Sequence, residues 1–377
     1  MNIDRRRVLR QSTVLAAACA AGLPGLSQAQ AASGAPAARR FDPQPGAWRT
    51  FEVTTRVDLV QPQGASRVWL PIPSVDTGWQ QPLTTSFSSN GQARVTDDGR
   101  EGTRLLYAEF ASSEKQPWVE LTSRVRTRSR AVDWSRHGAA GQPEDAASLR
   151  HWTRPTALLP TDGIVRETAL AATRGAATDE DKVRRLYDWV VANTYREPTV
   201  RGCGEGDIKT LLETRNLGGK CADLNALFVG LCRSVGVPAR DVYGLRLAPS
   251  AFGYRELGGN PASLKGAQHC RAEVYLQAHG WVAMDPADVA KVMRQETPEW
   301  IKDVTHPLVA PVNRALFGGW EGNWVAWNMA HDVALPQAKT PRLGFFMYPS
   351  AEDAQGRLDP YAPDDFKYQI TAREIAG

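Results

Sequence analysis

Alternating apolar and polar residues over positions 48–130 predict a small antiparallel β domain. The apolar positions of this alternation are Phe51, Val53, Val57 and Leu59, and further along Val119, Leu121 and Val125. Between them lie apolar runs at residues 68–70 and 105–107, separated by turns that carry Gly, Asn and Asp. Because successive side chains of a strand point to opposite faces, a period of two is typical of strands with one buried face.

From Thr178 the apolar period becomes that of an α-helix. Thr178 and Asp181 have the spacing of a capping box, with Asp in place of Glu. The apolar stripe that follows is Val183, Leu186, Tyr187, Val190 and Val191. A second helix is predicted directly after residues 218–220, Gly-Gly-Lys, and it ends at residues 236–238, Gly-Val-Pro. Its apolar stripe is Leu224, Leu227, Phe228, Leu231 and Val235.

Further strand-like runs and shifts in composition suggest how the chain is organised. The runs are at residues 242–247, 269–276, 281–285, 344–348 and 366–371. The segments that we expect are a signal peptide (1–31), a flexible lead-in rich in Ala, Gly and Pro (32–47), the β domain (48–130), a polar linker without periodicity (131–160), a central core (161–300) and a Trp-rich C-terminal β extension (301–377).

Residues 1–31 have the layout of an export signal. Arg5, Arg6 and Arg7 precede a short apolar run at residues 14–18, and residues 29–31, Ala-Gln-Ala, form a small-residue cleavage site. The arginines and the Ala-rich apolar run resemble the bacterial twin-arginine signal. An ordinary secretory signal is the alternative. We therefore predict a periplasmic protein without a membrane span.

Charge and cysteine usage narrow the possible partners. The 377-residue chain has a net charge of +4, of which residues 1–31 carry +3, so the remainder is nearly neutral. This balance predicts no nucleic-acid partner. The cysteines beyond residue 31 are Cys203, Cys221, Cys232 and Cys270. They show no C-x-x-C pair and no zinc-ribbon spacing, and no calcium-loop signature is present, so we expect no metal and no cofactor.

Cys221 is the strongest candidate for a nucleophile. Two glycines allow a tight turn before it, and the cysteine then lies at the first residue of the predicted helix. At that position the sulfur faces unsatisfied N–H groups and the positive end of the helix dipole, which favour the thiolate. The same N–H groups could hold an oxyanion. A reactive thiolate also needs a base and a group that orients the base.

His269 and Asp285 are the downstream candidates for these two roles. His269 opens one predicted strand, and Asp285 ends the next. For Asp285 to share the face of His269, Tyr275 must oppose Trp281, which requires a connection of odd length from residue 276 to residue 280. We predict this register.

Three segments together resemble the transglutaminase-like superfamily. They are residues 218–223 with 236–240, residues 269–275, and residues 280–286, in the order Cys, His, Asp. The resemblance implies an α+β, papain-like core with a triad in which Cys221 is the nucleophile, His269 the general acid/base and Asp285 its orienting partner. Many relatives have an aromatic residue where this chain has Arg271.

The other chemically active residues have plainer interpretations. Cys232 and Cys270 lie on apolar faces and are expected in the core. The sequence leaves three alternatives for Cys203: a loop residue at the mouth of the cleft, a redox partner for Cys221, or a residue without a functional role. His279 is expected to be solvated in a hairpin turn. The Trp320, Trp324 and Trp327 cluster favours packing over a substrate groove, and the pair His331 and Asp332 is expected to be structural.

The resemblance and the triad together predict cysteine-dependent acyl transfer on an amide of a peptide or protein substrate, through a thioester. Peptidase or amidase hydrolysis is favoured over protein-glutamine transamidation by the predicted location. The alternative is a non-catalytic periplasmic module that binds peptide or glycan. Whether residues 248–266 cover the cleft, and which oligomeric state the protein adopts, are open.

Overall fold

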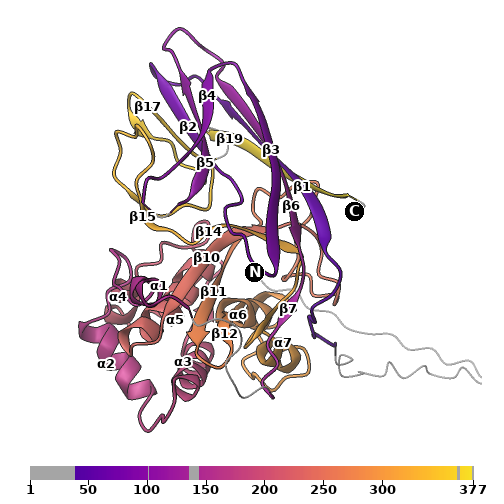
Figure 1. The fold of residues 1–377 in the computed structure, drawn as a ribbon, viewed down its shortest axis with the longest axis vertical. Helices are drawn as coiled ribbons and strands as arrows, with labels where there is room; N and C mark the ends of the chain where they lie inside the picture. Colours follow the sequence, from indigo (N-terminus) through magenta and orange to yellow (C-terminus); the bar gives the residue numbers. More distant parts are fainter. Residues whose placement is uncertain (1–38, 101, 136–143, 363–365, 376–377) are drawn as a thin grey trace, which may run out of the picture. The chain divides into compact units, whose positions relative to one another are not determined.

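Residues 39–377 are described by the computed structural model, apart from residues 101, 136–143, 363–365 and 376–377 (Figure 1). The predicted signal peptide (residues 1–31) lies outside the described residues. Ala38–Gly377 form one compact unit. Within the described residues, no helix has both the length and the apolarity that a membrane crossing requires.

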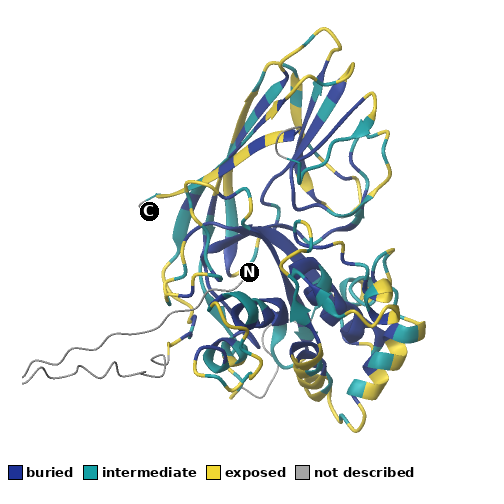
Figure 2. Ribbon diagram, turned by 180° about the vertical axis from the view of Figure 1, so that it is seen from behind, coloured by how far each residue is buried: buried dark blue, intermediate teal, exposed yellow. Residues whose placement is uncertain are grey.

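Two antiparallel sheets enclose the core of the β region. The first sheet has the order β19-β1-β6-β3, with β1 (Arg49–Leu59), β3 (Gln80–Ser89), β6 (Trp118–Thr127) and β19 (Phe366–Ile375). The second has the order β18-β17-β2-β5-β4, with β2 (Ser66–Pro71), β4 (Gln92–Asp97), β5 (Arg104–Phe110), β17 (Ser350–Asp353) and β18 (Gly356–Arg357). The strands predicted from the period of two are present, and their apolar positions point into this core, which gives the banded strands of Figure 2.

A third antiparallel sheet carries the strands that matter for the site. Its order is β12-β11-β10-β14, with β10 (Ala239–Arg246), β11 (Gln268–Leu276), β12 (Gly280–Met284) and β14 (Trp324–Asn328). Short pairs complete the strands: β7 (Arg130–Ala131) with β13 (Gly319–Trp320), β15 (His331–Val333) with β16 (Leu343–Phe345), and β8 (Tyr195–Arg196) with β9 (Gly218–Gly219), the last pair being parallel.

The helices of the described residues are α1 (Ala146–His151), α2 (Gly163–Ala172), α3 (Asp179–Asn193), α4 (Ile208–Glu213), α5 (Cys221–Ser234), α6 (Pro286–Gln295) and α7 (Ala310–Ala315). Helix α5 packs against β10 and β11 of the third sheet, and α2, α3, α4 and α6 pack against α5. The predicted capping box is confirmed: Thr178 and Asp181 exchange side-chain and backbone hydrogen bonds of 3.1 Å. Every residue of α5 except Asp223 is buried, because α2, α3 and α6 cover the faces that the sheet leaves open. The apolar stripe is therefore only part of its buried surface.

The C-terminal segment is shared among the sheets. Its strand β14 borders β10 of the third sheet, β17 pairs with β2, and β19 pairs with β1 along ten residues. The predicted boundaries at residues 130, 160 and 300 stay a prediction. The residues between 131 and 160 include the short helix α1, whose six residues are too few to give a periodic signal.

Candidate active site

Cys221 is the first residue of the buried helix α5. The preceding glycines form the short strand β9, so the chain enters the helix directly from a strand. Gly219 has no room for a side chain, because an added Cβ would lie 2.6 Å from the Cβ of Asp223. The sequence argument for a cysteine at the start of a helix therefore matches the geometry.

Asp223, the third residue of α5, fixes the loop around residues 203–206, which lies beside Cys221. Its carboxylate accepts hydrogen bonds from the backbone N–H groups of Lys220 (2.9 Å), Glu205 (3.0 Å) and Gly206 (3.0 Å). Gly204 contributes to the same fit: its φ is +89°, and an added Cβ would lie 1.8 Å from the Asp223 carboxylate. Only glycine suits such a position.

This loop brings Cys203 beside Cys221. The Cys203 carbonyl accepts the Ala222 N–H at 2.9 Å, and the Cys203 thiol donates to the Gln268 carbonyl at 3.2 Å. The Ala222 N–H is therefore not available to an oxyanion, contrary to the expectation that the N–H groups at the helix start are free. The Cys221 N–H has no acceptor among the described residues and remains available.

The hairpin of β11 and β12 has the predicted register. Tyr275 lies opposite Trp281, and Leu276 opposite Gly280, with a connection of odd length between the strands. Asp285 follows β12 and is the N-cap of α6, where its side chain accepts the Asp288 N–H at 3.1 Å. The sequence Asp-Pro at a helix start is a known capping signal, so this helix could have been predicted.

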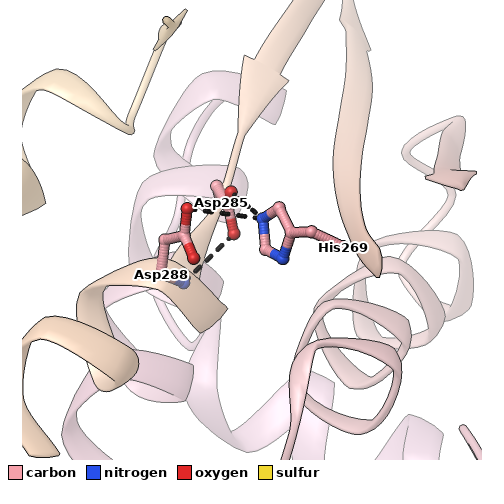
Figure 3. A group of neighbouring side chains, drawn as sticks. All are labelled: His269, Asp285 and Asp288. Atoms are coloured by element: carbon pink, nitrogen blue, oxygen red, sulfur yellow. Dashed lines mark hydrogen bonds and ion pairs between the residues drawn. The ribbon is translucent and has the colours of Figure 1, made fainter. Parts of the chain in front are cut away.

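His269 and Asp285 are in direct contact. The Nε2 atom of His269 lies 2.7 Å from Asp285 Oδ2, and both side chains are buried. Figure 3 shows that this nitrogen faces two carboxylates, those of Asp285 and Asp288, while the other ring nitrogen points away from them. Asp288 Oδ2 is 3.3 Å from Nε2. The sequence analysis missed Asp288, although its place three residues after an N-cap aspartate was a usable signal.

Asp288 is charged because Arg246 is beside it. Burial raises the pKa of Asp288, but the Arg246 guanidinium, 2.5 Å away, and His269 outweigh it and hold the pKa well below its usual range. Burial and the charge of Asp288 raise the pKa of Asp285. Burial and Arg246 disfavour the imidazolium of His269, yet Asp288 and Asp285 overcome both and raise its pKa to about 9.

The Cys221 thiol responds to this arrangement. Burial alone raises its pKa, whereas hydrogen bonds with Cys203, Cys270 and His269, and the charge of His269, lower the pKa well below its usual value. A thiolate paired with an imidazolium follows from these opposite directions. Burial and the neighbouring Cys221 raise the pKa of Cys203 and of Cys270, so both remain thiols beside it.

Three more buried residues contact His269 or Asp285. Asn225, one turn along α5, donates to Asp285 Oδ1 (3.1 Å) and to the Cys270 carbonyl (2.9 Å). Trp324 donates its indole N–H to the His269 carbonyl at 2.9 Å. Arg271 lies 3.6 Å from Asp285 and over the Trp324 ring. These contacts join segments far apart in sequence, so local patterns did not reveal them.

A cleft of about 690 Å³ opens beside these residues. Cys203, Cys221 and His269 line it, and so do residues 258–260 and 265–267 from the loop before β11 and Gln268, the first residue of β11. Residues 258–260 and 265–266 of the segment 248–266, whose place relative to the cleft the sequence left undecided, therefore form part of the cleft wall. Gln268 is buried, and its side-chain Nε2 has no hydrogen-bond acceptor among the described residues.

The remaining candidates are placed as follows. Cys232 is in the core, and burial raises the pKa of its thiol. Trp320, Trp324 and Trp327 are buried and do not line the cleft, so the packing interpretation is confirmed. The prediction for His279 is wrong: its side chain is 4% exposed, because it packs edge-on against Trp134.

The pair His331 and Asp332 lies away from the cleft lining. His331 is buried 3.4 Å from Asp241, and Asp332 accepts the Ala157 N–H. No thiol or hydroxyl group hydrogen-bonds to His331 in the described part of the chain, in agreement with a structural role.

The ligand atoms of His269, Asp285 and Asp288 lie within 4.8 Å of one another, as the atoms around a metal ion would. Their charge is already balanced by Arg246, by Arg271 and by the N–H groups of Asn225 and Asp288. A divalent cation would have to displace Arg246, which is itself buried. The donor set does not suit a metal, and metal independence stays a prediction.

A helix that begins at a cysteine and packs on an antiparallel sheet carrying a His–Asp pair defines the papain-like α+β class. Residues 166–286 match the family described as the transglutaminase-like superfamily. The chain is 34% identical over 345 residues to an uncharacterised protein of Haemophilus influenzae, an alignment covering 86% of this chain and 91% of that protein. The chain belongs to the transglutaminase-like superfamily.

Solved structures resemble this chain to different degrees. One described as a "Putative Cysteine Protease", from Cytophaga hutchinsonii, has a TM-score of 0.55 and 15% identity, covering 88% of this chain and 93% of that one. The periplasmic domain of TgpA from Pseudomonas aeruginosa has a TM-score of 0.32 and 16% identity, covering 67% of this chain and 91% of that one. The first of these two agrees with the α+β fold expected from the sequence.

Proposed function

We propose that this protein is a cysteine-dependent hydrolase that cleaves an amide bond of a peptide or protein through a thioester. Membership of the transglutaminase-like superfamily and the fold it shares with a structure described as a cysteine protease support this class. The observation that carries the proposal is the Cys221 thiol at the start of α5, which lines one cleft with the His269 imidazole that Asp285 and Asp288 contact. The charge of His269 lowers the pKa of this thiol.

In the proposed reaction the Cys221 thiolate attacks the amide carbonyl carbon. The Cys221 N–H and Gln268 Nε2, neither of which has an acceptor among the described residues, stabilise the oxyanion. Since Nε2 of His269 is held by Asp285, the other ring nitrogen donates its proton to the leaving amine. The C–N bond breaks and a thioester remains.

Water then attacks the thioester while His269 accepts a proton from it, and collapse of the intermediate breaks the C–S bond, which releases the acid and regenerates the thiolate–imidazolium pair. Water is the proposed acceptor because the cleft is lined by lysine, tyrosine and glutamine side chains, whose polar groups tolerate solvent. We propose that the reaction takes place in the periplasm, on the basis of the export signal in residues 1–31.

Alkylation by iodoacetamide at about pH 6 tests the proposal. A thiolate reacts at this pH, whereas an ordinary thiol of pKa about 8.5 is almost fully protonated. We expect fast modification of Cys221 and at least a roughly tenfold slower rate in His269→Gln. Cys232→Ala is the matched control, since it removes a buried thiol far from the cleft lining and should leave the rate unchanged.

The acyl-enzyme provides the second part of the test. Incubation with a mixture of peptides, followed by acid quench and mass measurement, should show an acyl adduct on Cys221 that disappears with time in water. Persistence of the adduct until an amine is added would indicate transamidation instead. Slow alkylation together with reversible peptide binding would favour the non-catalytic module.

A further inference from the structure

The charged side chains that line the cleft beside Cys221 are all basic. They are Arg196, Lys220, Arg246, Lys265 and Lys291, and no Asp or Glu of the described residues lines the cleft with them. The whole chain carries 45 Lys and Arg against 41 Asp and Glu, so a cleft of average composition would hold both signs in similar number. The excess of positive charge is therefore a property of this cleft.

Two of these cations have carboxylate partners behind the cleft. Arg246 is paired with Asp288 at 2.5 Å, and Lys291 lies 3.3 Å from Glu256 while donating to the backbone carbonyl of the same residue. Their charges are already compensated within the protein.

The other three cations have no such partner. Arg196 donates to the neutral side chain of Gln295 at 3.0 Å, and within the described ranges no carboxylate lies at ion-pair distance from Arg196, Lys220 or Lys265. Burial and the charge of Arg196 lower the pKa of Lys220, and the charges of Cys203, Cys221 and Asp223 offset this only in part, so the two cations repel each other. Partly buried like charges are unfavourable until an anion joins them.

The unpartnered cations Lys220 and Arg196 lie beside the start of α5, and Lys265 lines the same cleft. Lys220 immediately precedes Cys221, and Arg196 lies opposite Gly219 in the β8–β9 pair. An anion bound to them would therefore lie within a residue or two of the scissile carbonyl. Gln268, whose buried Nε2 has no acceptor among the described residues, adds a donor for a ligand with acceptor oxygens, the role that the proposed reaction already gives it.

We propose that the substrate is an acidic peptide whose carboxylate groups, beside the scissile amide, bind Arg196, Lys220 and Lys265. The cleavage of this peptide rests on the proposed function, but its binding does not. The carboxylate can come from an acidic side chain or from a free chain end, and both give the same ion pairs.

Binding to the Cys221→Ala protein tests this without turnover. The probes are N-acetylated heptapeptide amides with a central Gln and either Glu, Gln or Lys on both sides of it, and a fourth peptide that ends in a free carboxylate after the central Gln. At about 20 mM NaCl we expect the Glu peptide to bind at least roughly tenfold more tightly than the neutral one, and this ratio to shrink to about threefold near 300 mM. Equal affinity for all peptides, or preference for Lys, would overturn the proposal.

Variants in the same background locate the effect. Arg196→Gln or Lys220→Gln should reduce the Glu-to-Gln ratio about threefold. Lys209→Gln on α4, an exposed lysine paired with Glu213, is the matched control and should leave the ratio unchanged. An unchanged Glu-to-Gln affinity ratio in both cleft variants would refute the assignment of Arg196 and Lys220 as anion-binding residues. If a variant does not fold, the salt dependence of peptide binding to Cys221→Ala alone still tests whether the cleft prefers acidic peptides.

The two proposals fail separately. If Cys221→Ala prefers acidic peptides but the intact protein forms no thioester with them, the hydrolase proposal fails and the anionic specificity stands. If the intact protein acylates neutral peptides as fast as acidic ones, the hydrolase stands and the specificity fails. Tighter binding of the fourth peptide than of the Glu peptide would identify a free chain end as the source of the carboxylate.

Discussion

Replacing Asp288 with Asn should lower the pKa of His269 and weaken its ion pair with Cys221. Asp288 lies 3.3 Å from His269 Nε2 and is the first of the groups that favour the imidazolium. Burial and Arg246 oppose the imidazolium, and both remain in the variant. The pKa of about 9 exceeds the ordinary 6.5 by an amount worth roughly 3 kcal/mol. Losing one of two supporting carboxylates should remove most of that difference.

The consequence at neutral pH is large. With a pKa of about 9, roughly 97% of His269 is protonated at pH 7.5, and with a pKa near 6.5 roughly 9% is protonated. We therefore expect the rate of acyl-enzyme formation at pH 7.5 to fall about tenfold and to recover near pH 5.5. The alkaline limb of the rate profile should move to lower pH.

Nuclear magnetic resonance of 15N-labelled histidine measures the pKa directly. The titration is recorded in Cys221→Ala and in Cys221→Ala with Asp288→Asn, with His269→Gln to assign the signal among the six histidines of the chain. Because the Asp288→Asn change leaves Arg246 without its carboxylate partner, the variant with Arg246→Gln added is measured as well. The pKa of His269 should be higher with both Asp288→Asn and Arg246→Gln than with Asp288→Asn alone, because the positive charge of Arg246 no longer repels the imidazolium. A pKa that stays near 9 without Asp288 would refute the reasoning.

Three further predictions concern the parts that hold the site. Gly204→Ala should lower the free energy of unfolding by more than about 2 kcal/mol, against about 1 kcal/mol for Gly253→Ala, because only the first adds a steric clash to a positive φ; urea unfolding compares them. Trp324→Phe leaves the His269 carbonyl without its donor and should cost about 1–3 kcal/mol and slow alkylation of the cysteine, whereas unchanged values would exclude a positioning role. Glu273→Gln should cost about 3–5 kcal/mol at pH 7, since two arginines surround this buried carboxylate. Burial raises the pKa of Glu273 but those arginines lower it overall, so its contribution is present above the unfolded pKa and lost as the pH falls through the folded value; the gap between Glu273→Gln and the parent should therefore narrow in acid.

The sequence alone determined the elements whose hydrogen bonds and faces are local. The period of two predicted the strands of the β region, and the Thr178 capping box and the glycines before Cys221 predicted where two helices begin. The strand parity of His269 and Asp285 predicted the register of their hairpin, because two adjacent strands joined by a short turn have few possible pairings. The family was recognisable for the same reason, since its motifs are short and local.

Only the tertiary structure decided which distant groups complete the site. Asp288 and Arg246 are 42 residues apart and meet because α6 and β10 lie against the same cleft. Cys203 lies beside the start of α5 because Asp223 fixes its loop, and the Cys203 carbonyl accepts the Ala222 N–H. Strand β14 pairs with β10 and thereby brings the Trp324 indole within hydrogen-bond distance of the His269 carbonyl. His279 was mistaken for a solvated turn residue because Trp134, 145 residues earlier, covers it. Such contacts depend on how non-adjacent elements pack, and a local pattern of apolar and polar residues carries no information about that packing.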